Sequence, residues 1–307
     1  MQAQAIDLKG SSLVLMVTLG CYLECAHCCL ACNRDKVQYH ISEQDMCDYV
    51  LDAYKASIGS VVFTGGEPTL YLSDIYKPMQ LAQSLGMYID LRTNGQLING
   101  NLKKLKEHGL CRLGLSFDRY HDVKKDIVFN AIKTAQDLDI EVYLDWVGTE
   151  SREFIKEYLG LDDTVLRMVG EPMRIGQAVT LGDNHFCDIP LYTIQYCSEY
   201  SRSCGKTEEP LLTVFPDHYV SLHACCWVHP RLIFKQARGR KWIEQLTLDS
   251  TFDPASDFLY KKGIGGLVDK AMKECPQLLK YGYSHQCEVC YDLLEILFPV
   301  KQFARGR

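Results

Sequence analysis

The chain has 307 residues, 47% of them hydrophobic and 23% charged, so it can bury a full core in one large domain or in a domain with an appendage. Its formal net charge of −6 gives no electrostatic reason to expect nucleic acid or an anionic membrane as a partner, because phosphate binding normally needs a basic excess. The composition therefore favours a small or weakly charged substrate.

The cysteine content is the unusual feature of the composition. The apolar run Leu13–Leu19 is too short for a membrane span and lacks the flanks of a secretory signal, so we predict a buried strand and a cytoplasmic protein. In that compartment fifteen cysteines are poorly explained as disulfides, and metal ligation or thiol chemistry is the better explanation. Five lie between Cys21 and Cys32 and eight from Cys187 to Cys290, which predicts two separate metal sites.

From Ser12 to about Gly170, short apolar runs alternate with longer segments of helical periodicity, which predicts repeated strand–helix units. The predicted strands are 12–18, 60–64, 87–92, 111–116, 140–146 and 164–169, and the predicted helices are 43–57, 73–85, 99–108, 121–137 and 150–159. Six such units favour an α/β fold in which a parallel sheet with right-handed crossovers curls into a partial TIM-like (β/α)6 barrel. Chemistry in such folds lies at the carboxyl ends of the strands.

The strand–helix rhythm ends after Gly170, where Pro172 and Gly176 interrupt it. The elements predicted beyond this point are strands 211–216 and 219–223 around a turn at 217–218, helices at 231–246 and 255–274, and a Cys-x-x-Cys leading into an apolar helix at 293–298. We therefore predict a barrel domain over residues 1–180 and a small α+β module over residues 181–307.

A C-x3-C-x2-C loop formed by Cys21, Cys25 and Cys28 follows the first predicted strand directly. Three thiolates on one short loop can bind three irons of a [4Fe–4S] cluster and leave the fourth iron open for another ligand. A structural zinc site or chance clustering is the alternative. The spacing and its place after the first strand resemble the signature of the radical S-adenosylmethionine (AdoMet) superfamily.

The resemblance implies that the open iron binds the amino and carboxylate groups of AdoMet. Electron transfer from an external one-electron reductant then releases a 5′-deoxyadenosyl radical, while the protein holds the sulfonium and excludes water. We expect His27, on the same loop, to contact the cofactor. Cys29 and Cys32 are extra to the pattern and are predicted to be packing thiols, although Cys25, Cys28 and Cys32 form an alternative ligand set.

A glycine-rich turn with one carboxylate, Gly65-Gly66-Glu67, follows the second predicted strand. Glycines at a strand end let the backbone approach a ligand closely, and the carboxylate can accept hydrogen bonds from an ammonium group. The turn resembles the family's Gly-Gly-Glu motif, which binds the amino group of AdoMet. Alone such a turn is weak evidence, but its place after the cysteine loop makes the combination specific.

Polar residues also follow the third, fourth and sixth predicted strands, as a barrel site requires. Ser116 and Asp118 are candidates to hydrogen-bond the ribose or the substrate. Asn94 is a cofactor-binding candidate whose alternative role is to cap a turn, and His121 is expected only to start a helix. Arg174 can pair with the AdoMet carboxylate as a planar donor fork, with a surface ion pair as the alternative.

A second group of cysteines lies in the predicted C-terminal module. The preferred ligands of a second, auxiliary [4Fe–4S] cluster are Cys204, Cys225, Cys287 and Cys290, with Cys197 and Cys226 as substitutes for the first two. The arrangement is similar to the SPASM and twitch extensions of radical AdoMet enzymes that mature peptides or oxidise sugars. It differs from them because His218 stands at the usual glycine of the hairpin turn and the cysteines are too few for two auxiliary clusters. Structural zinc is the alternative.

The fate of the substrate radical divides the functional hypotheses. An auxiliary cluster that accepts an electron would give a dehydrogenation or a cross-link. A thiol such as Cys226 would instead return a hydrogen atom from the opposite face and give an epimerisation, with an inert buried cysteine as the alternative for that residue.

The resemblance to peptide-maturing enzymes favours modification of a ribosomally synthesised peptide. A sugar or aminoglycoside is the runner-up substrate, because we expect no leader-binding domain before the first strand. The hypothesis from another class is a non-catalytic iron–sulfur or zinc protein. Gly65–Glu67 argues against that hypothesis, since an electron carrier needs no site for an amino group.

Overall fold

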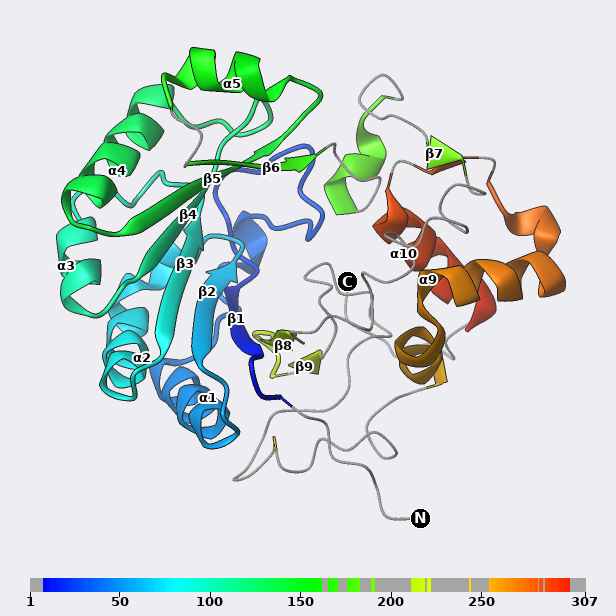
Figure 1. Ribbon diagram of the computed structural model, residues 1–307, viewed down its shortest axis with the longest axis horizontal. Coiled ribbons are helices and arrows are strands. Elements are labelled where there is room, and N and C mark those ends of the chain that lie inside the picture. The colour runs from blue at the N-terminus through cyan, green and yellow to red at the C-terminus, as the bar shows by residue number, and fades with distance from the viewer. Residues whose placement is uncertain are drawn as a thin grey trace.

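The chain is built around a curved parallel sheet that carries helices on its convex side. A computed structural model describes residues 8–161, 165–170, 176–182, 189–190, 211–218, 220–221, 243, 254–280, 282–283 and 285–298. The main sheet has the strand order β6-β5-β4-β3-β2-β1-β8-β9, and Figure 1 shows α1–α5 along its outer side. None of the described helices is long and apolar enough to cross a membrane.

The elements of this part alternate along the chain. The strands of the main sheet are β1 (Ser12–Thr18), β2 (Ser60–Gly65), β3 (Tyr88–Thr93), β4 (Arg112–Ser116), β5 (Glu141–Val147), β6 (Leu166–Gly170), β8 (Leu211–Val214) and β9 (Val220–Ser221). The helices are α1 (Glu43–Lys55), α2 (Leu72–Ser84), α3 (Leu102–Glu107), α4 (Lys125–Asp137) and α5 (Arg152–Leu159). Short 3-10 turns cover Arg34–Lys36, Pro68–Tyr71 and Gly176–Thr180.

The predicted α/β fold with a partial (β/α)6 barrel is confirmed. Strands β1 to β6 are parallel neighbours in chain order, and their ends lie within two residues of the predicted ends. Local signals start the helices: the Ser42 hydroxyl accepts a hydrogen bond from the Asp45 N–H at α1, and the Ser151 hydroxyl accepts one from the Phe154 N–H at α5. Helix α4 begins at residue 125 instead of 121, which leaves residues 117–124 as a loop at the carboxyl end of β4.

The predicted hairpin after residue 210 is observed, and it belongs to the main sheet. Strand β8 pairs in parallel with β1, and β9 pairs antiparallel with β8. This pairing satisfies the backbone groups along the edge of β1 that a six-stranded sheet would leave open. His218 in the turn has a left-handed φ of 64°, the conformation that glycine adopts most easily, and its Nδ1 lies 2.6 Å from the Tyr49 hydroxyl of α1. The division of the chain at residue 180 stays a prediction.

The two faces of the main sheet differ in character. The outer face packs residues such as Leu15, Leu91 and Leu144 into one core with α4 residues such as Ala131. On the inner face, the half formed by β1, β2 and the end of β8 is apolar and is made by Val14, Met16, Val62 and Phe215. The half formed by β3 to β6 is charged and is made by Asp90, Arg92, Arg112, Asp145 and Arg167.

The C-terminal part has a core of its own. It comprises α9 (Pro254–Glu274), a 3-10 turn at Pro276–Leu278, α10 (Gln286–Leu297) and the antiparallel pair β7 (Ile189–Pro190) and β10 (Gly282–Tyr283). Buried residues of this core include Leu267, Tyr283 and Leu293, and α9 kinks at Gly263, where φ is +66°. The predicted helix at 231–246 lies outside the described residues except for residue 243.

Candidate functional site

The cysteine loop connects β1 to the turn at Arg34–Lys36 and is closed by its own backbone. The Cys21 N–H donates to the Asn33 carbonyl at 3.0 Å, and the Cys28 N–H donates to the Cys25 carbonyl at 3.0 Å. Cys21, Cys25 and Cys28 form no disulfide, and the loop lies at the carboxyl end of β1, where barrel chemistry is expected.

The thiols of this loop influence one another electrostatically, so they lie close together. Burial, together with negative charge on Cys21 and Cys28, raises the pKa of Cys25 to about 12. Hydrogen bonds from the Cys32 side chain and backbone lower the pKa of Cys28 to about 6, and the Cys32 N–H lies 3.4 Å from the Cys28 Sγ. Crowded thiolates of this kind are favourable only beside a positive group such as a metal centre.

The Gly65-Gly66-Glu67 turn packs directly against the start of the cysteine loop. A Cβ on Gly65 would lie 2.3 Å from the Thr18 carbonyl oxygen, and one on Gly66 would lie 2.1 Å from the Gly20 carbonyl oxygen. The Gly66 N–H donates to the Thr18 carbonyl at 2.7 Å, and the Glu67 N–H donates to the Gly20 carbonyl at 2.8 Å. Here the glycines are therefore required for two strand ends to approach each other closely.

The Glu67 carboxylate is buried and accepts hydrogen bonds from the protein itself. Oε1 accepts from the Thr69 N–H, the Thr69 hydroxyl and the Thr93 hydroxyl, and Oε2 accepts from the Asn94 N–H at 2.9 Å. Burial raises the pKa of Glu67 against these hydrogen bonds. Because each carboxylate oxygen has two lone pairs, Oε2 retains room for one more donor.

Asn94 joins this turn to the cysteine loop. Its Nδ2 lies 3.9 Å from the Cys21 Sγ, while its Oδ1 accepts a hydrogen bond from the Gln96 N–H at 2.9 Å. The predicted turn-capping contact and a contact to the first cysteine are therefore both present. Thr69 and Thr93, which complete the arrangement, were not predicted from the sequence; the strand-end position of Thr93 beside Asn94 was the available signal.

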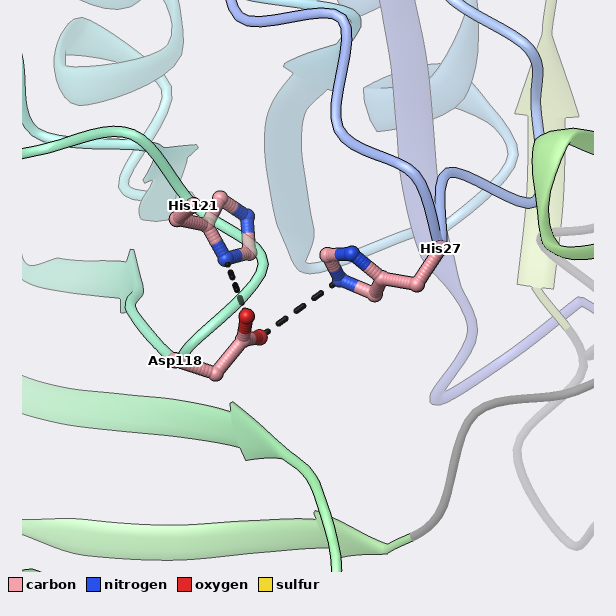
Figure 2. Close-up of side chains that lie close together, drawn as sticks. All are labelled: His27, Asp118 and His121. Carbon is pink, nitrogen blue, oxygen red and sulfur yellow. Dashed lines mark ion pairs between the residues drawn. The ribbon is translucent and has the colours of Figure 1, made fainter. Parts of the chain in front are cut away.

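His27, Asp118 and His121 form a second polar group beside the cysteines (Figure 2). The His27 Nε2 lies 3.5 Å from Asp118 Oδ2, and the His121 Nδ1 lies 2.9 Å from Asp118 Oδ1. The expectation that His121 only starts a helix is wrong, because α4 begins four residues later and the ring turns back to Asp118. Charge on Asp118 acts on Cys25, so this group borders the cysteine loop.

The ligand atoms of these three residues lie within 4.8 Å of one another, a set that could hold a metal ion. The carboxylate of Asp118 is already used, because it also accepts hydrogen bonds from the Tyr120 N–H at 2.8 Å and the Val147 N–H at 3.3 Å. A carboxylate with this many donors is better described as the centre of a hydrogen-bonded network than as a free metal ligand.

Burial sets the protonation of this network. It lowers the pKa of His27 to about 4, against the charge of Asp118, so the ring is neutral at pH 7. Burial alone would raise the pKa of Asp118, but hydrogen bonding and charge from His121 lower it below its usual value. The His27 Nδ1 is buried and has no hydrogen-bond partner within the described part of the chain. With Nε2 facing the carboxylate, a neutral ring presents Nδ1 as an acceptor.

Of the other predicted site residues, the structure describes Ser116, Cys287 and Cys290. Ser116 ends β4 in register with Asp145 of β5, at the same edge of the sheet. Cys287 and Cys290 lie inside α10 and not before it, because the His285 Nδ1 accepts a hydrogen bond from the Cys287 N–H and so starts the helix earlier than expected. The remaining predicted residues, Arg174, Cys197, Cys204, Cys225 and Cys226, lie outside the described residues.

Comparison with known families identifies the first half of the chain. The sequence model of the Radical SAM superfamily matches residues 15–161, which run from within β1 to just beyond α5 and include both polar groups described above. This part of the chain is a radical SAM domain. Membership implies a [4Fe–4S] cluster and AdoMet as cofactors, and the residues at the sheet edge are where a radical SAM barrel would hold them.

The proteins similar to this chain include both a small-molecule synthase and enzymes with bound peptides. The Fe-coproporphyrin III synthase of Methanosarcina barkeri is 34% identical over 113 residues, which are 36% of this chain but only 28% of that protein. The structure of anSMEcpe with bound AdoMet and a Cp18Cys peptide covers 94% of this chain and 96% of its own, with 18% identity and a TM-score of 0.59. Streptococcus suis SuiB bound to precursor peptide SuiA covers 93% of this chain and 76% of its own, with 14% identity and a TM-score of 0.50.

Proposed function

We propose that this radical SAM enzyme modifies a ribosomally synthesised peptide, by epimerisation or by cross-linking, with Cys21, Cys25 and Cys28 as the ligands of its [4Fe–4S] cluster. The observation that carries the proposal is the convergence of three mutually interacting thiols with Glu67 and His27 at one edge of the sheet. Structural similarity over more than nine tenths of this chain to two structures that contain peptides supports the peptide as substrate.

The residues at this edge fit both cofactors. Three neighbouring thiols without a disulfide are suitable ligands for iron. The buried His27 Nδ1 beside them has no partner among the described residues and is an acceptor that a ligand donor would satisfy. When bound, the cluster and AdoMet supply one-electron chemistry that cleaves AdoMet and removes a hydrogen atom from the substrate.

The chain's own residues bind and orient the cofactor in this proposal. Glu67 holds the Gly-Gly turn against the cysteine loop and offers its remaining Oε2 lone pair to the ammonium of AdoMet. Asp118 fixes the orientation of His27 next to the cysteines, while Asn94, Ser116 and Arg174 remain proposed cofactor contacts. The hydrogen bonds of Thr18 and Gly20 to the turn fix it against the start of the cysteine loop.

An auxiliary cluster belongs to the same proposal, with Cys204, Cys225, Cys287 and Cys290 as ligands in a SPASM-like or twitch-like module. Cys287 and Cys290 lie on the first two turns of α10, and their spacing of three residues puts both on one side of that helix. If an auxiliary cluster accepts the electron of the substrate radical, the product is a cross-link or a dehydrogenated residue. If Cys226 returns a hydrogen atom, the product is an epimer.

A small-molecule substrate is the second candidate, favoured by the sequence similarity to Fe-coproporphyrin III synthase. That similarity covers 36% of this chain, so it carries less information about the substrate than the peptide-bound structures do.

The test measures iron and sulfide content, electron paramagnetic resonance and 5′-deoxyadenosine formation on anaerobically reconstituted wild type and on the Cys21/Cys25/Cys28→Ala variant. We expect about eight irons in wild type and about four in the variant, with 5′-deoxyadenosine formation lost. About four irons in wild type and none in the variant would support the first cluster and remove the auxiliary cluster. Unchanged 5′-deoxyadenosine formation in the variant would overturn the ligand assignment.

The substrate class is tested by incubating the reconstituted enzyme, AdoMet and dithionite with candidate precursor peptides in deuterated water. A cross-linked or dehydrogenated peptide loses two hydrogens, whereas an epimerised residue gains one deuterium from solvent. Conversion of a tetrapyrrole with no change in any peptide would support the small-molecule alternative.

A further inference from the structure

The charged half of the inner sheet face contains polar atoms that the protein leaves without hydrogen-bond partners. Within the described residues, the Asp90 Oδ1, Tyr143 hydroxyl and Asp145 Oδ1 are buried and unpartnered. Leaving such atoms unpaired in the folded protein is unfavourable, and sites that bind polar ligands are a common reason for it.

Asp145 is the one of these three nearest the carboxyl edge. Strand pairing aligns it with Ser116 of β4 on one side and with Arg167 of β6 on the other. Asp90 and Tyr143 lie further from that edge, in register with Arg112 and Gly114. Because parallel strands place register partners on the same face, Ser116, Asp145 and Arg167 form a row that faces the inside of the curved sheet.

The Asp145 carboxylate is paired only loosely. Its Oδ1 lies 3.7 Å from the Arg167 Nε, which is an ion-pair distance and too long for a hydrogen bond. Burial raises the pKa of Asp145, and the charges of Arg167 and Arg92 oppose that rise. The Arg167 side chain is 58% exposed, so its remaining N–H groups are accessible to a ligand. An acceptor and a set of donors thus lie side by side.

The two other carboxylates near this edge, Glu67 and Asp118, accept more hydrogen bonds than Asp145 does. Glu67 accepts four hydrogen bonds, and Asp118 accepts from two backbone N–H groups and lies beside two imidazoles. Asp145 accepts no side-chain hydrogen bond from the described residues, although it lies on a strand between two neighbours that could supply one. The Asp145 carboxylate can therefore still accept a hydrogen bond from a ligand.

The surrounding charges restrict the chemistry of that partner. Arg92, Arg112 and Arg167 face this half of the sheet together with Asp90 and Asp145. A free ammonium would be attracted by Asp145 but repelled by Arg167. A free carboxylate would be attracted by Arg167 but repelled by Asp145. A neutral group with one donor and one acceptor next to each other satisfies both side chains, and an amide is such a group.

Tyr143 and Gly114 lie beside Asp145 and Arg167 on the inner face of the sheet. A Cβ on Gly114 would lie 2.4 Å from the Tyr143 hydroxyl oxygen, so glycine is required for the ring to lie across β4. The Arg112 and Arg167 guanidinium carbons lie 5.3 Å and 5.4 Å from the centre of this ring, which holds Arg167 by cation–π interaction. The Arg167 side chain is therefore oriented before any ligand binds.

We propose that Asp145 and Arg167 bind an amide group of the peptide substrate, Asp145 accepting a hydrogen bond from the amide N–H and Arg167 donating one to the carbonyl oxygen. The inference rests on the peptide substrate of the proposed function and assigns it a contact on β5 and β6. Asp145 is then a specificity-determining residue, because the pairing selects a neutral donor–acceptor group over a charged one.

The experiment uses reconstituted enzyme with AdoMet and the blocked amino acid N-acetylalanine N′-methylamide as the amide probe, with binding followed by saturation-transfer nuclear magnetic resonance. Methylammonium and acetate serve as charged probes. The variants are Asp145→Ala and Arg167→Ala, and Asp137→Ala on the exposed end of α4 is the matched control. We expect the amide probe to bind wild type and the control equally and to bind each site variant at least about tenfold more weakly.

Three outcomes would overturn the proposal: equal binding of the amide probe to Asp145→Ala, tighter binding of either charged probe to wild type, or a loss of AdoMet affinity in Asp145→Ala that matches the loss of probe binding. The last result would mean that the row binds the adenine of AdoMet, which also has a neighbouring donor and acceptor. Intact cluster signals in the variants show that they fold. If amide binding depends on Asp145 but no peptide is modified, the site stands and the peptide function falls.

Discussion

The carboxyl edge of the main sheet and the helical pair α9–α10 both contain two cysteines spaced C-x2-C and one buried glutamate, but they hold these residues in different ways. At the sheet edge, Cys25 and Cys28 lie on a loop, and Glu67 accepts hydrogen bonds from hydroxyl and backbone N–H groups. In the helical pair, Cys287 and Cys290 lie on a helix, and Glu288 is 3.1 Å from the Lys280 ammonium.

The difference shows why spacing alone does not define a metal site. The loop thiols raise or lower one another's pKa because strand ends bring them to one place, whereas Cys290 is buried in the apolar core of the helical pair with Leu293. A loop can rearrange its thiols around a cluster, but a helix fixes the direction of each side chain. We therefore expect the sheet edge to respond much more strongly than α10 to changes at its polar residues.

The largest contrast is expected between single cysteine variants. Cys21→Ala should lose the iron of the first cluster and all 5′-deoxyadenosine formation, since it removes one of three ligands. Cys32→Ala should retain both, because that buried thiol serves Cys28 through a hydrogen bond and not iron. Iron content and 5′-deoxyadenosine measured after anaerobic reconstitution decide between the two ligand sets.

Cys287→Ala completes this comparison. It should keep 5′-deoxyadenosine formation while the iron content falls by about four if α10 contributes to an auxiliary cluster. The reverse pattern, with activity kept in Cys21→Ala and lost in Cys32→Ala, would assign the cluster to Cys25, Cys28 and Cys32.

A second contrast concerns acid stability of the cluster-free protein. The folded state holds the pKa of His27 near 4, below its unfolded value of about 6.5, so the unfolded chain binds more protons between these values. Stability is therefore present above pH 6.5 and is lost as the pH falls towards 4, by on the order of 3 kcal/mol. Urea denaturation at several pH values measures this slope, and His27→Asn should flatten it.

The matched variant in the helical pair is His285→Asn, which keeps an N-cap for α10. Burial lowers the pKa of His285 too, so this variant should change the acid slope in the same direction. A slope that stays the same in His27→Asn would mean that the ring is not held neutral beside Asp118.

The sequence predicted the parts of this structure that depend on local patterns. Six strands and five helices follow from periodicity, and the cysteine loop and the Gly-Gly-Glu turn follow from spacing and place along the chain. The pairing of β8 with β1 was not predicted, because a parallel contact between residues two hundred positions apart leaves no local signal.

Contacts at the site were harder to predict than the site itself. Asp118 was a candidate for ribose or substrate, but its contacts to His27 and His121 depend on the path of a loop that the helical pattern obscured. Asp145 was missed, although an acidic residue in the interior of β5, between Leu144 and Trp146, was visible in the sequence. Its unpartnered state depends on both neighbouring strands and cannot be read from one.

The smallest contrast we expect is between two buried glutamates, each changed to glutamine. In Glu67→Gln one carboxylate oxygen becomes an NH2 group. If Oε1 keeps its three donors, the new group faces the Asn94 N–H, so a buried donor is left unpaired at a cost of about 1–3 kcal/mol.

In Glu288→Gln the lost ion pair is with Lys280, which is half exposed and still 2.6 Å from Asp292. The buried glutamine oxygen can still accept a hydrogen bond from Lys280, so the loss is only the difference between a charged and a neutral acceptor, about 1 kcal/mol. Urea unfolding of both cluster-free variants at pH 7 measures the difference, and equal losses would show that the sheet edge is no more dependent on its polar contacts than the helical pair.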